Sequence, residues 1–452
     1  MNEASQTTIG DFFKLVPGFA FKSSDFTDNG VRVIKIKNVK AGYFSDHEFA
    51  YVAPTFLTAR PEKLARIGDL LISMSGNRHD GSPETWVGKV AFFNRYEPHF
   101  INQRVGALRP KQQAMIDVRF ASFLLASRPY QELFISIATS SGGQANLSPN
   151  QILSAPLTPP SLDQQLGIAA LLGALDDKIE LNRRVNETLE AMARAIFQDW
   201  FVTFGPTRAK MEGRPPYLAP DLWSLFPDRL DAEGKPEDWK WGILNDVVSI
   251  LETGGRPKGG VSAYREGVPS IGAESIVGLG IFDYNKTKFI PRSYFEKMTK
   301  GHIQSRDVLL YKDGGRPGEF EPHATLFGDG FPFEECAINE HVYRIRATPD
   351  FGQNLLYFSL TSDATMAEMR LKGTGVAIPG LNSTQARSLT LLLPSRTAAE
   401  GFERTTEPFI GRVLANCKEA KTLAATRDLL LPRLMSGELR VKEAEHIIEA
   451  AV

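Results

Sequence analysis

The sequence predicts an α+β fold of two strand-rich globules, each followed by a long α-helix, with the two helices packed as an antiparallel, coiled-coil-like spacer. Three observations predict this fold. The chain repeats itself at an offset of 234 to 238 residues, each half opens with short apolar runs between turn residues, and each half ends in a heptad pattern. With 452 residues and 42% hydrophobic content, the chain can form two or three domains that each bury a core.

The internal repeat consists of four short matches that occur in the same order in both halves. Each match alone is weak, but their common order and nearly constant offset make chance a poor explanation. The matched pairs are Gly30–Ile36 with Gly267–Ala273, Ile67–Ile72 with Ser305–Leu310, Ile101–Val105 with Ile338–Val342, and Pro159–Ser161 with Leu393–Ser395. One fold is therefore used twice, as a pseudo-two-fold internal repeat.

The repeated pieces have the composition of β-strands. Apolar and β-branched residues dominate Val31–Val39, Asp69–Met74 and Val87–Phe93, and Gly, Pro, Asn and Asp separate these runs. Arg119–Ser127 and Asn354–Ser362 are typical of helices instead. Each half therefore opens with a strand-rich globule that contains a few helices.

After each globule, apolar residues recur in alternating steps of four and three, which is the heptad pattern of a coiled coil. Asparagines interrupt both stripes, and polar seam residues penalise wrong registers. At 1.5 Å per residue each helix is roughly 60 Å long if unbroken, and the nearest partner for its stripe is the other copy. The predicted seam residues are Ile168, Leu172, Leu175, Ile179, Asn182, Asn186, Leu189, Ile196, Trp200, Val413, Asn416, Leu423, Leu430 and Leu434.

Composition changes along the chain predict the domain boundaries. The segment between the first helix and the second globule is rich in Pro, Gly and charge, and its aromatic residues Tyr217, Trp223 and Phe226 are expected to pack on the helices. The charged, then Ala-rich tail is expected to fray. The predicted domains are the first globule (1–160), the first helix (161–204), a linker (205–240), the second globule (241–395), the second helix (396–440) and the tail (441–452).

Charge and cysteine content exclude several classes of protein. Cys336 and Cys417 are the only cysteines, without metal-ligand spacing, so neither a disulfide framework nor a structural zinc site is expected. The net charge of -1 argues against binding DNA by bulk positive charge, although residues 1–150 carry 17 Lys and Arg against 13 Asp and Glu. No signal peptide or membrane-spanning run is visible, so a cytoplasmic location is expected.

If the chain binds DNA, which its charge permits without proving, Arg, Lys, Asn and Gln side chains on loops would contact the bases, because they carry the paired donors and acceptors that distinguish base edges. Asn102 and Asn339 occupy matching places in the repeat and are expected to satisfy the backbone instead. Gly142–Gly143 and Gly373–Gly375 are expected to be turns. The DNA-binding candidates are Lys35, Lys37, Asn38, Asn77, Arg78, Gln144 and Asn146 in the first globule, and Arg256, Lys258, Lys312, Arg316 and Asn382 in the second.

The chain resembles the specificity subunits of type I restriction-modification enzymes over essentially its whole length. Pro159–Gln165, Leu175–Asn182 and Leu189–Phe201 are similar to the family's central spacer helix, and Leu225–Asp228 with Gly234–Trp239 to its entry into the second recognition domain. Arg427–Glu438 is similar to its C-terminal end. Thr397–Glu400 departs from the pattern, since a Gln is commoner there, which affects only the local helix cap.

Several motifs imitate catalytic sites but do not fit them. Arg214–Tyr217 is similar to an amino-methyltransferase loop, yet its first residue must accept a hydrogen bond from the target amino group, which Arg cannot do. Pro227–Asp228 with Glu233–Lys235 imitates a nuclease metal motif, but it lies in the Pro/Gly-rich linker. Gly278–Gly280 is an incomplete dinucleotide fingerprint, and no phosphate-binding loop is present. We therefore expect no enzymatic activity, metal or cofactor in this chain.

The resemblance implies a sequence-specific DNA-binding subunit that directs adenine methylation and restriction by partner subunits. The implied partners are double-stranded DNA, two methyltransferase subunits that use S-adenosylmethionine, and restriction subunits that use ATP and magnesium, with no membrane. Because the two globules differ in detail, an asymmetric bipartite site is expected. Two alternatives stay open: a stand-alone DNA-binding regulator, which would bind a specific site without partners, and a protein-binding helical scaffold, which would show no salt-dependent DNA affinity.

Overall fold

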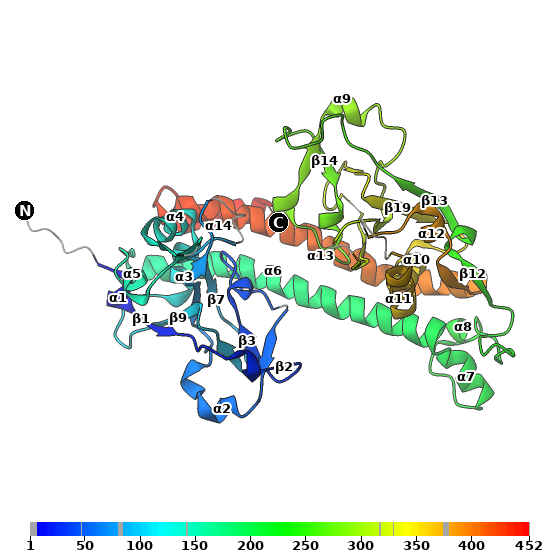
Figure 1. The fold of residues 1–452 in the computed structure, drawn as a ribbon, viewed down its shortest axis with the longest axis horizontal. Coiled ribbons are helices and arrows are strands. Elements are labelled where there is room, and N and C mark those ends of the chain that lie inside the picture. Colours follow the sequence, from blue (N-terminus) through cyan, green and yellow to red (C-terminus); the bar gives the residue numbers. More distant parts are fainter. Residues whose placement is uncertain are drawn as a thin grey trace, which may run out of the picture. The chain divides into compact units, whose positions relative to one another are not determined.

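The computed structural model describes residues 7–46, 48–79, 85–141, 143–315, 318–328, 330–373 and 379–451. The chain divides into two units, one made of Met1–Asp177 with Leu423–Val452 and the other of Lys178–Thr422. Each unit contains one mixed globule of strands and short helices together with part of each long helix (Figure 1). The predicted α+β fold is confirmed.

The first globule is built on two four-stranded sheets and one small sheet. The orders are β1-β9-β5-β7, β2-β4-β3-β8 and β10-β11-β6. The first is antiparallel, whereas β3 runs parallel to β8 in the second. The strands are β1 (Phe13–Pro17), β2 (Phe26–Thr27), β3 (Val31–Ile34), β4 (Ala50–Val52), β5 (Leu70–Ser73), β6 (Ser75–Gly76), β7 (Val90–Phe92), β8 (His99–Ile101), β9 (Val105–Pro110), β10 (Thr139–Ser141) and β11 (Gln144–Asn146).

Short helices complete this globule. Asp117 caps one of them, because its Oδ1 accepts a 2.7 Å hydrogen bond from the Phe120 N–H. Arg119 on the same helix donates through Nη2 to Asp177 Oδ1 at 2.7 Å, which ties the globule to the long helix within the first unit. The helices are α1 (Ile9–Phe12), α2 (Phe56–Ala59), α3 (Val118–Ala126), α4 (Arg128–Ile137) and α5 (Pro149–Leu153).

The second globule has the same plan. Its sheets have the orders β13-β19-β16-β17, β15-β14-β18 and β12-β20. The strands are β12 (Lys240–Ile243), β13 (Val248–Thr253), β14 (Val268–Ile271), β15 (Lys288–Ile290), β16 (Val308–Tyr311), β17 (Ala324–Leu326), β18 (Ala337–Ile338), β19 (Val342–Ala347) and β20 (Thr390–Leu393). The helices are α9 (Arg292–Phe295), α10 (Gln353–Leu360), α11 (Asp363–Lys372) and α12 (Ser383–Arg387).

Strand register shows that the two halves are structural repeats. In the first half Ser73 pairs with Val105, and at the equivalent place in the second half Tyr311 pairs with Val342. The parallel pair of Ile34 with Ile101 likewise corresponds to Ile271 with Ile338. These equivalences have offsets of 237 to 238 residues, within the range of 234 to 238 seen in the sequence, so side chains at matching positions can be compared directly.

The two long helices, α6 (Leu162–Phe197) and α13 (Arg396–Met435), pair antiparallel within each unit. In the first unit, Arg427 Nη1 donates to Asp176 Oδ1 at 2.7 Å. In the second unit, Asn182 Nδ2 donates to Glu419 Oε2 at 2.7 Å, and the Phe197 and Phe402 rings lie 6.1 Å apart. Asparagines on the two helices also bond each other, with Asn416 Nδ2 donating to Asn186 Oδ1 at 2.8 Å.

None of the predicted seam side chains is exposed. Ile179, Asn186, Leu189 and Ile196 are half-buried, and the other ten, from Ile168 to Leu434, are buried. The asparagine bonds would be lost if one helix slid by a turn, because each amide needs a partner at a matching height. The heptad pattern therefore corresponds to a continuous interface within each unit, with a polar layer that favours one register.

The segment after α6 is more structured than a linker. It contains α7 (Gly205–Met211) and α8 (Pro220–Trp223), and Phe226 packs edge-on against Trp200 with ring centroids 5.0 Å apart. Tyr217 donates its hydroxyl to Asp199 Oδ2 at 2.8 Å, and its ring packs against Trp223 at 5.6 Å. The aromatic residues thus anchor this segment on the end of α6.

The expectation of a frayed tail is wrong for most of its length. α13 ends before Gly437, whose φ of 76° suits a helix C-terminus, and the chain then forms α14 (Val441–Ala451). Leu439 and Ala444 are buried, and Val441 packs close to Gly167 of α6 within the first unit. The tail orders because its apolar residues fall on one face of a helix.

Candidate nucleic-acid interface

Four loop segments meet at one end of the central strands in each globule, and we call this set the rim. The first rim comprises Lys35–Asn38, Met74–Arg78, Asn102–Arg104 and Gln144–Asn146, and the second comprises Gly272–Ser275, Lys312–Gly315, Asn339–His341 and Pro379–Leu381. Equivalent backbone hydrogen bonds join them. Met74 N–H donates to Arg104 O at 2.8 Å, and Lys312 N–H to His341 O at 3.0 Å. The same scaffold therefore presents both sets of side chains.

Arginine and amide side chains from distant parts of the sequence come together on the first rim. Arg104 Nη1 donates to the exposed Gln144 at Oε1, 2.6 Å away, and Ser75 Oγ donates to Asn146 Oδ1 at 2.7 Å. Asn77 Nδ2 donates to Thr85 Oγ1 at 3.0 Å. These donors and acceptors are the groups that distinguish base edges in the major groove.

The first-rim candidates on the turn after β3 have different surroundings. Asn38 is buried, and its Oδ1 accepts from Lys35 N–H at 2.9 Å, so its amide stabilises the turn. Lys37 Nζ lies 2.9 Å from Glu48 Oε2 on the surface, and Lys35 Nζ lies 4.5 Å above the Phe26 ring. Each lysine thus has a partner at or near the surface, whereas Asn38 is a structural residue.

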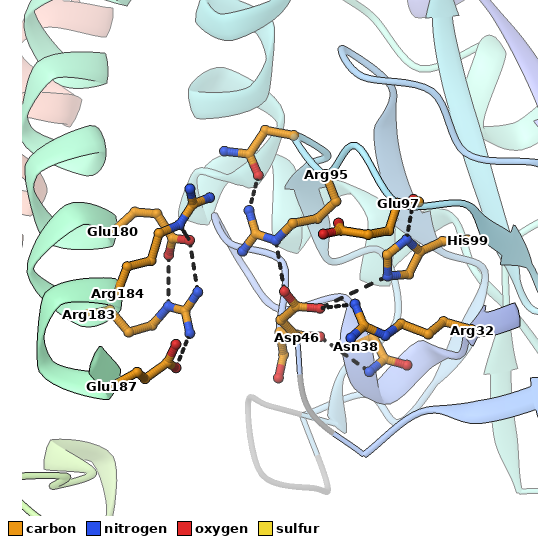
Figure 2. A network of polar contacts seen from close by, with 12 residues as sticks. Arg32, Asn38, Asp46, Arg95, Glu97, His99, Glu180, Arg183, Arg184 and Glu187 are labelled. Carbon is orange, nitrogen blue, oxygen red and sulfur yellow. Dashed lines mark hydrogen bonds and ion pairs between the residues drawn. The ribbon is translucent and has the colours of Figure 1, made fainter. Parts of the chain in front are cut away.

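A partly buried polar cluster supports this turn (Figure 2). Asp46 accepts from Arg95 Nε at 2.9 Å and lies 3.8 Å from Arg32 Nη1 and 4.0 Å from His99 Nε2. His99 is fully buried, and this burial lowers its pKa below the usual value. Asn38 donates through Nδ2 to the carbonyl of Ser45, next to Asp46. The cluster fixes the backbone that presents the lysines.

Figure 2 also draws ion pairs along α6, which belong to the second unit. Glu180 accepts two hydrogen bonds from Arg183, at 2.9 and 2.8 Å, and one from Arg184 at 3.0 Å. Partly exposed pairs of this spacing contribute about 0.3 to 0.5 kcal/mol each. They favour the helix and do not form a ligand site.

The second rim is a chain of alternating charges. Arg256 Nε lies 2.7 Å from Glu340 Oε1, and the same carboxylate oxygen lies 3.5 Å from His341 Nε2. His341 Nδ1 contacts Asp313 Oδ1 at 2.5 Å, and Lys312 Nζ contacts Asp313 Oδ2 at 2.6 Å. Burial alone would raise the pKa of Asp313, but the hydrogen bonds from Lys312 and His341 lower it. The structure thus joins two predicted residues, Arg256 and Lys312, through three that were not predicted.

Side chains at equivalent rim positions differ in charge and hydrogen-bonding character. Glu274 stands where the first half has Lys37, and His341 stands where it has Arg104. Glu274, Asp313 and His341 line an open hollow of about 780 Å³ on the second rim. The first rim therefore offers mainly donors, whereas the second offers carboxylate acceptors beside cations.

The remaining candidates separate into three groups. Asn382 caps α12, because its Oδ1 accepts from Gln385 N–H at 2.9 Å, as Ser148 does for α5 in the first half. Arg78 donates through Nη2 to the Ala138 carbonyl, and Lys258 is exposed. Arg316 lies outside the described residues, as do Gly142, Thr374 and Gly375 of the expected turns.

The sequence did contain a signal for the residues that were missed. Arg104 and His341 form one of the two differing pairs in the motif Ile101–Val105 against Ile338–Val342, and Gln103 against Glu340 is the other. Because the remaining residues of the motif match between the halves, Arg104 and His341 occupy the same point of the shared scaffold. A difference at such a point is not required for folding and indicates a role in function. Asn339 has a structural role, since its Oδ1 accepts from His341 N–H at 2.9 Å.

Among the residues that the structure describes, no group of three or more His, Cys, Asp and Glu side chains is placed to hold a metal ion. Within the same part of the chain, no helix has the length and apolar character needed to cross a lipid bilayer.

Comparison with known proteins gives consistent results. A family model described as the type I restriction modification DNA specificity domain matches residues 1–191. The specificity subunit of the type I restriction enzyme HindI from Haemophilus influenzae is 24% identical over 430 residues, which cover 85% of this chain and 89% of that protein. The MjaIX specificity subunit from Methanocaldococcus jannaschii is 24% identical over 63% of this chain and 60% of its own length.

A solved structure has the same fold. The S subunit of a type I restriction-modification system from M. genitalium superposes with a TM-score of 0.50 at 14% sequence identity. The match covers 96% of this chain and 97% of that subunit.

Proposed function

The chain belongs to the specificity subunits of type I restriction-modification enzymes, and we propose that each of its two rims contacts one half of an asymmetric, bipartite DNA site. One observation supports this proposal above the others. A single scaffold, repeated with the same register, presents Arg104 and Gln144 in one half and Asp313 and His341 in the other. Different side chains at equivalent places select different base sequences.

The chemistry of each rim indicates the kind of base edge that it selects. An arginine beside an amide, as in Arg104 with Gln144, supplies donors for guanine O6 and N7 and a donor–acceptor pair for adenine. On the second rim, carboxylates such as Asp313 accept from the amino group of cytosine, and Lys312 donates to guanine. We expect the first half-site to contain purines opposite the arginine and the second to present an exocyclic amino group.

Catalysis belongs to the partner subunits. The subunit acts with DNA and with methylase and restriction subunits, and we propose that it binds two methyltransferase subunits and, through them, the restriction subunits. S-adenosylmethionine, ATP and magnesium would then be bound by those partners and not by this chain. The recognition globules would hold DNA so that a target adenine can be rotated out of the helix toward a methyltransferase.

An exposed apolar face of α6 is a suitable docking surface for a methyltransferase subunit. Leu181 and Met192 are 53% and 45% exposed, and the half-buried Val185 lies between them. Their spacing of four and seven residues places all three on one side of the helix, about 100° from the seam. Apolar side chains grouped in this way mark protein interfaces.

Paired substitutions test this docking surface. Leu181→Asp with Met192→Asp should abolish methyltransferase binding in a pull-down while leaving the circular dichroism spectrum and melting temperature unchanged. Arg184→Asp, on the same helix and exposed, is the control and should retain binding. Retained binding by the double variant would contradict the docking surface without affecting the assignment of DNA recognition.

The proposed function is tested by mapping adenine methylation in a methylation-free host. The host expresses either the cognate methyltransferase alone or the methyltransferase with this chain. A bipartite motif that appears only with the chain supports the proposal and identifies the site. A soluble complex that yields no motif would contradict it and favour the scaffold, whereas tight specific binding by the chain alone would favour the stand-alone regulator.

A further inference from the structure

A groove beside the second rim has the composition of a phosphate site. It is lined by Gly254 and Gly255 of the loop after β13, and by Tyr294, Lys297, Met298, Thr299 and Lys300 of α9 and the turn that follows it. The two lysines are exposed, and neither has an ion-pair partner among the described residues. The groove therefore places two positive charges opposite a bare segment of backbone.

Close backbone packing explains the glycines. A Cβ atom at Gly254 would lie 1.6 Å from the Ile338 carbonyl oxygen, and one at Gly301 would lie 2.6 Å from Gly254 Cα. Only glycine fits where the two loops meet at this distance. The loop after β13 and the turn after α9 are thus held together by the fold, so the groove does not depend on an occupant for its shape.

Several backbone N–H groups of the groove are available to an acceptor. Two others are already engaged: Gly254 N–H donates to the Asn339 carbonyl at 3.1 Å, and Gly301 N–H donates to Glu252 Oε1 at 2.8 Å. Within the described part of the chain, the N–H groups of Gly255, Thr299 and Lys300 donate to no protein acceptor. Backbone N–H groups next to lysine ammonium groups are a recurring way to bind phosphate oxygens.

The groove adjoins the second rim, because Gly254 N–H donates to the carbonyl of the rim residue Asn339. Arg256 follows Gly255 directly, and its Nε lies 2.7 Å from Glu340, which in turn contacts His341. A duplex whose bases face the rim would therefore pass its backbone beside Gly255 and Lys300. Lys258, exposed on the same loop, extends the positive charge.

The first half has a related arrangement at the equivalent place. A Cβ atom at Gly18 would lie 2.0 Å from the Asn102 carbonyl oxygen, which is a close approach of the same kind as that between Gly254 and the Ile338 carbonyl. Arg60 lies 5.2 Å above the ring of Phe19, and Lys63 Nζ donates to the Pro17 carbonyl at 3.0 Å. Positively charged side chains therefore lie at this place in both halves. On the rims, by contrast, the charge changes sign at one equivalent position, from Lys37 in the first half to Glu274 in the second.

This contrast separates two kinds of DNA contact. Contacts to phosphates carry no sequence information and are the same for any half-site, whereas contacts to bases differ between half-sites. We propose that the groove between Gly254–Gly255 and Lys297–Lys300 binds a backbone phosphate of the DNA duplex beside the second half-site. The proposal rests on the proposed function, since it takes the second rim to be the base-contacting surface.

The test is the salt dependence of DNA binding by the complex of this chain with its methyltransferase. Lys297→Gln with Lys300→Gln is compared with wild type and with a charge-matched control, Lys240→Gln with Lys286→Gln, whose exposed lysines do not line the groove. One lost phosphate contact makes the slope of log Kobs against log salt concentration less negative by about 0.9. Between 50 and 200 mM salt, wild type should therefore lose roughly 3-fold more affinity than the groove variant.

The expected result has three parts. The groove variant shows the reduced slope on cognate and scrambled duplexes alike, its methylation motif is unchanged, and Lys297→Arg with Lys300→Arg restores the wild-type slope. A wild-type slope in the groove variant, or a slope change as large in the control, would overturn the proposal, and so would a changed motif. Failure of the proposed function is distinguishable, because wild type itself would then show no motif.

Discussion

Arg104 offers the sharpest test of how the first rim contacts DNA. We consider Arg104→Ala, which removes the guanidinium and its 2.6 Å hydrogen bond to Gln144. Because this bond lies on the surface, its loss should change the free energy of unfolding by no more than about 1 kcal/mol. The variant should fold normally and form the complex with its methyltransferase.

The effect on DNA binding should be much larger. A bidentate contact between an arginine and guanine contributes about 1 to 3 kcal/mol of discrimination. At 1.4 kcal/mol per tenfold change in affinity, Arg104→Ala should weaken binding to the cognate duplex by about 5- to 140-fold. For a duplex in which the contacted base pair has been replaced, Arg104→Ala should cause almost no further loss of affinity, because wild type does not make the contact there either.

Equilibrium titrations at one fixed salt concentration measure this difference. The methyltransferase complex is titrated with the cognate duplex and with duplexes that carry each single base-pair change. Arg66→Ala is the matched control. Arg66 is an exposed arginine of the same globule, but it precedes β5, and the rim lies at the opposite end of that strand. An equal loss on every duplex would make Arg104 a phosphate contact, and no loss at all would refute a role in DNA binding.

Three further predictions concern the scaffold, and urea unfolding of the full chain measures each of them. Asp307 is fully buried and accepts hydrogen bonds from Arg344 and Arg346, so Asp307→Ala should cost about 3 to 5 kcal/mol, and a loss below about 1 kcal/mol would contradict the arrangement. Leu172 on the seam is also fully buried, so Leu172→Ala should cost about 2 to 5 kcal/mol, whereas the exposed Leu166→Ala should cost far less. Burial raises the pKa of Glu403 from 4.5 to about 7, so the folded state binds the extra proton and is favoured below pH 4.5. That stability, on the order of 3 kcal/mol, is lost as pH rises through 7, and an unchanged pH profile in Glu403→Gln would contradict the assignment.

The helices could be predicted from the sequence because their signal is local and periodic. Leu172, Leu175 and Asn182 recur at heptad spacing, and that spacing determines which face of α6 is buried. The same reasoning missed α14, where a charged and Ala-rich composition suggested fraying although its apolar residues share one helical face. Composition alone therefore underestimates a short amphipathic helix that has a partner.

The rims could be predicted only in part, because their contacts join residues that are far apart in the chain. Arg104 and Gln144 are 40 residues apart, and His341 and Asp313 are 28 apart. No local pattern indicates such pairs. Asn38 and Asn382 illustrate the opposite problem, since an amide that stabilises a turn or caps a helix has the same sequence context as one that contacts DNA.

The central claim is that each rim determines a different half of one DNA site, and the methylation motif measures this directly. The host genome is mapped after expression of the methyltransferase with wild type, with Arg104→Ala plus Gln144→Ala, or with Lys312→Ala plus His341→Ala. The first variant should relax the motif in one half-site only, and the second variant should relax it only in the other half-site. Relaxation of the same half-site by both variants, or two unchanged motifs, would contradict the assignment of one rim to each half-site.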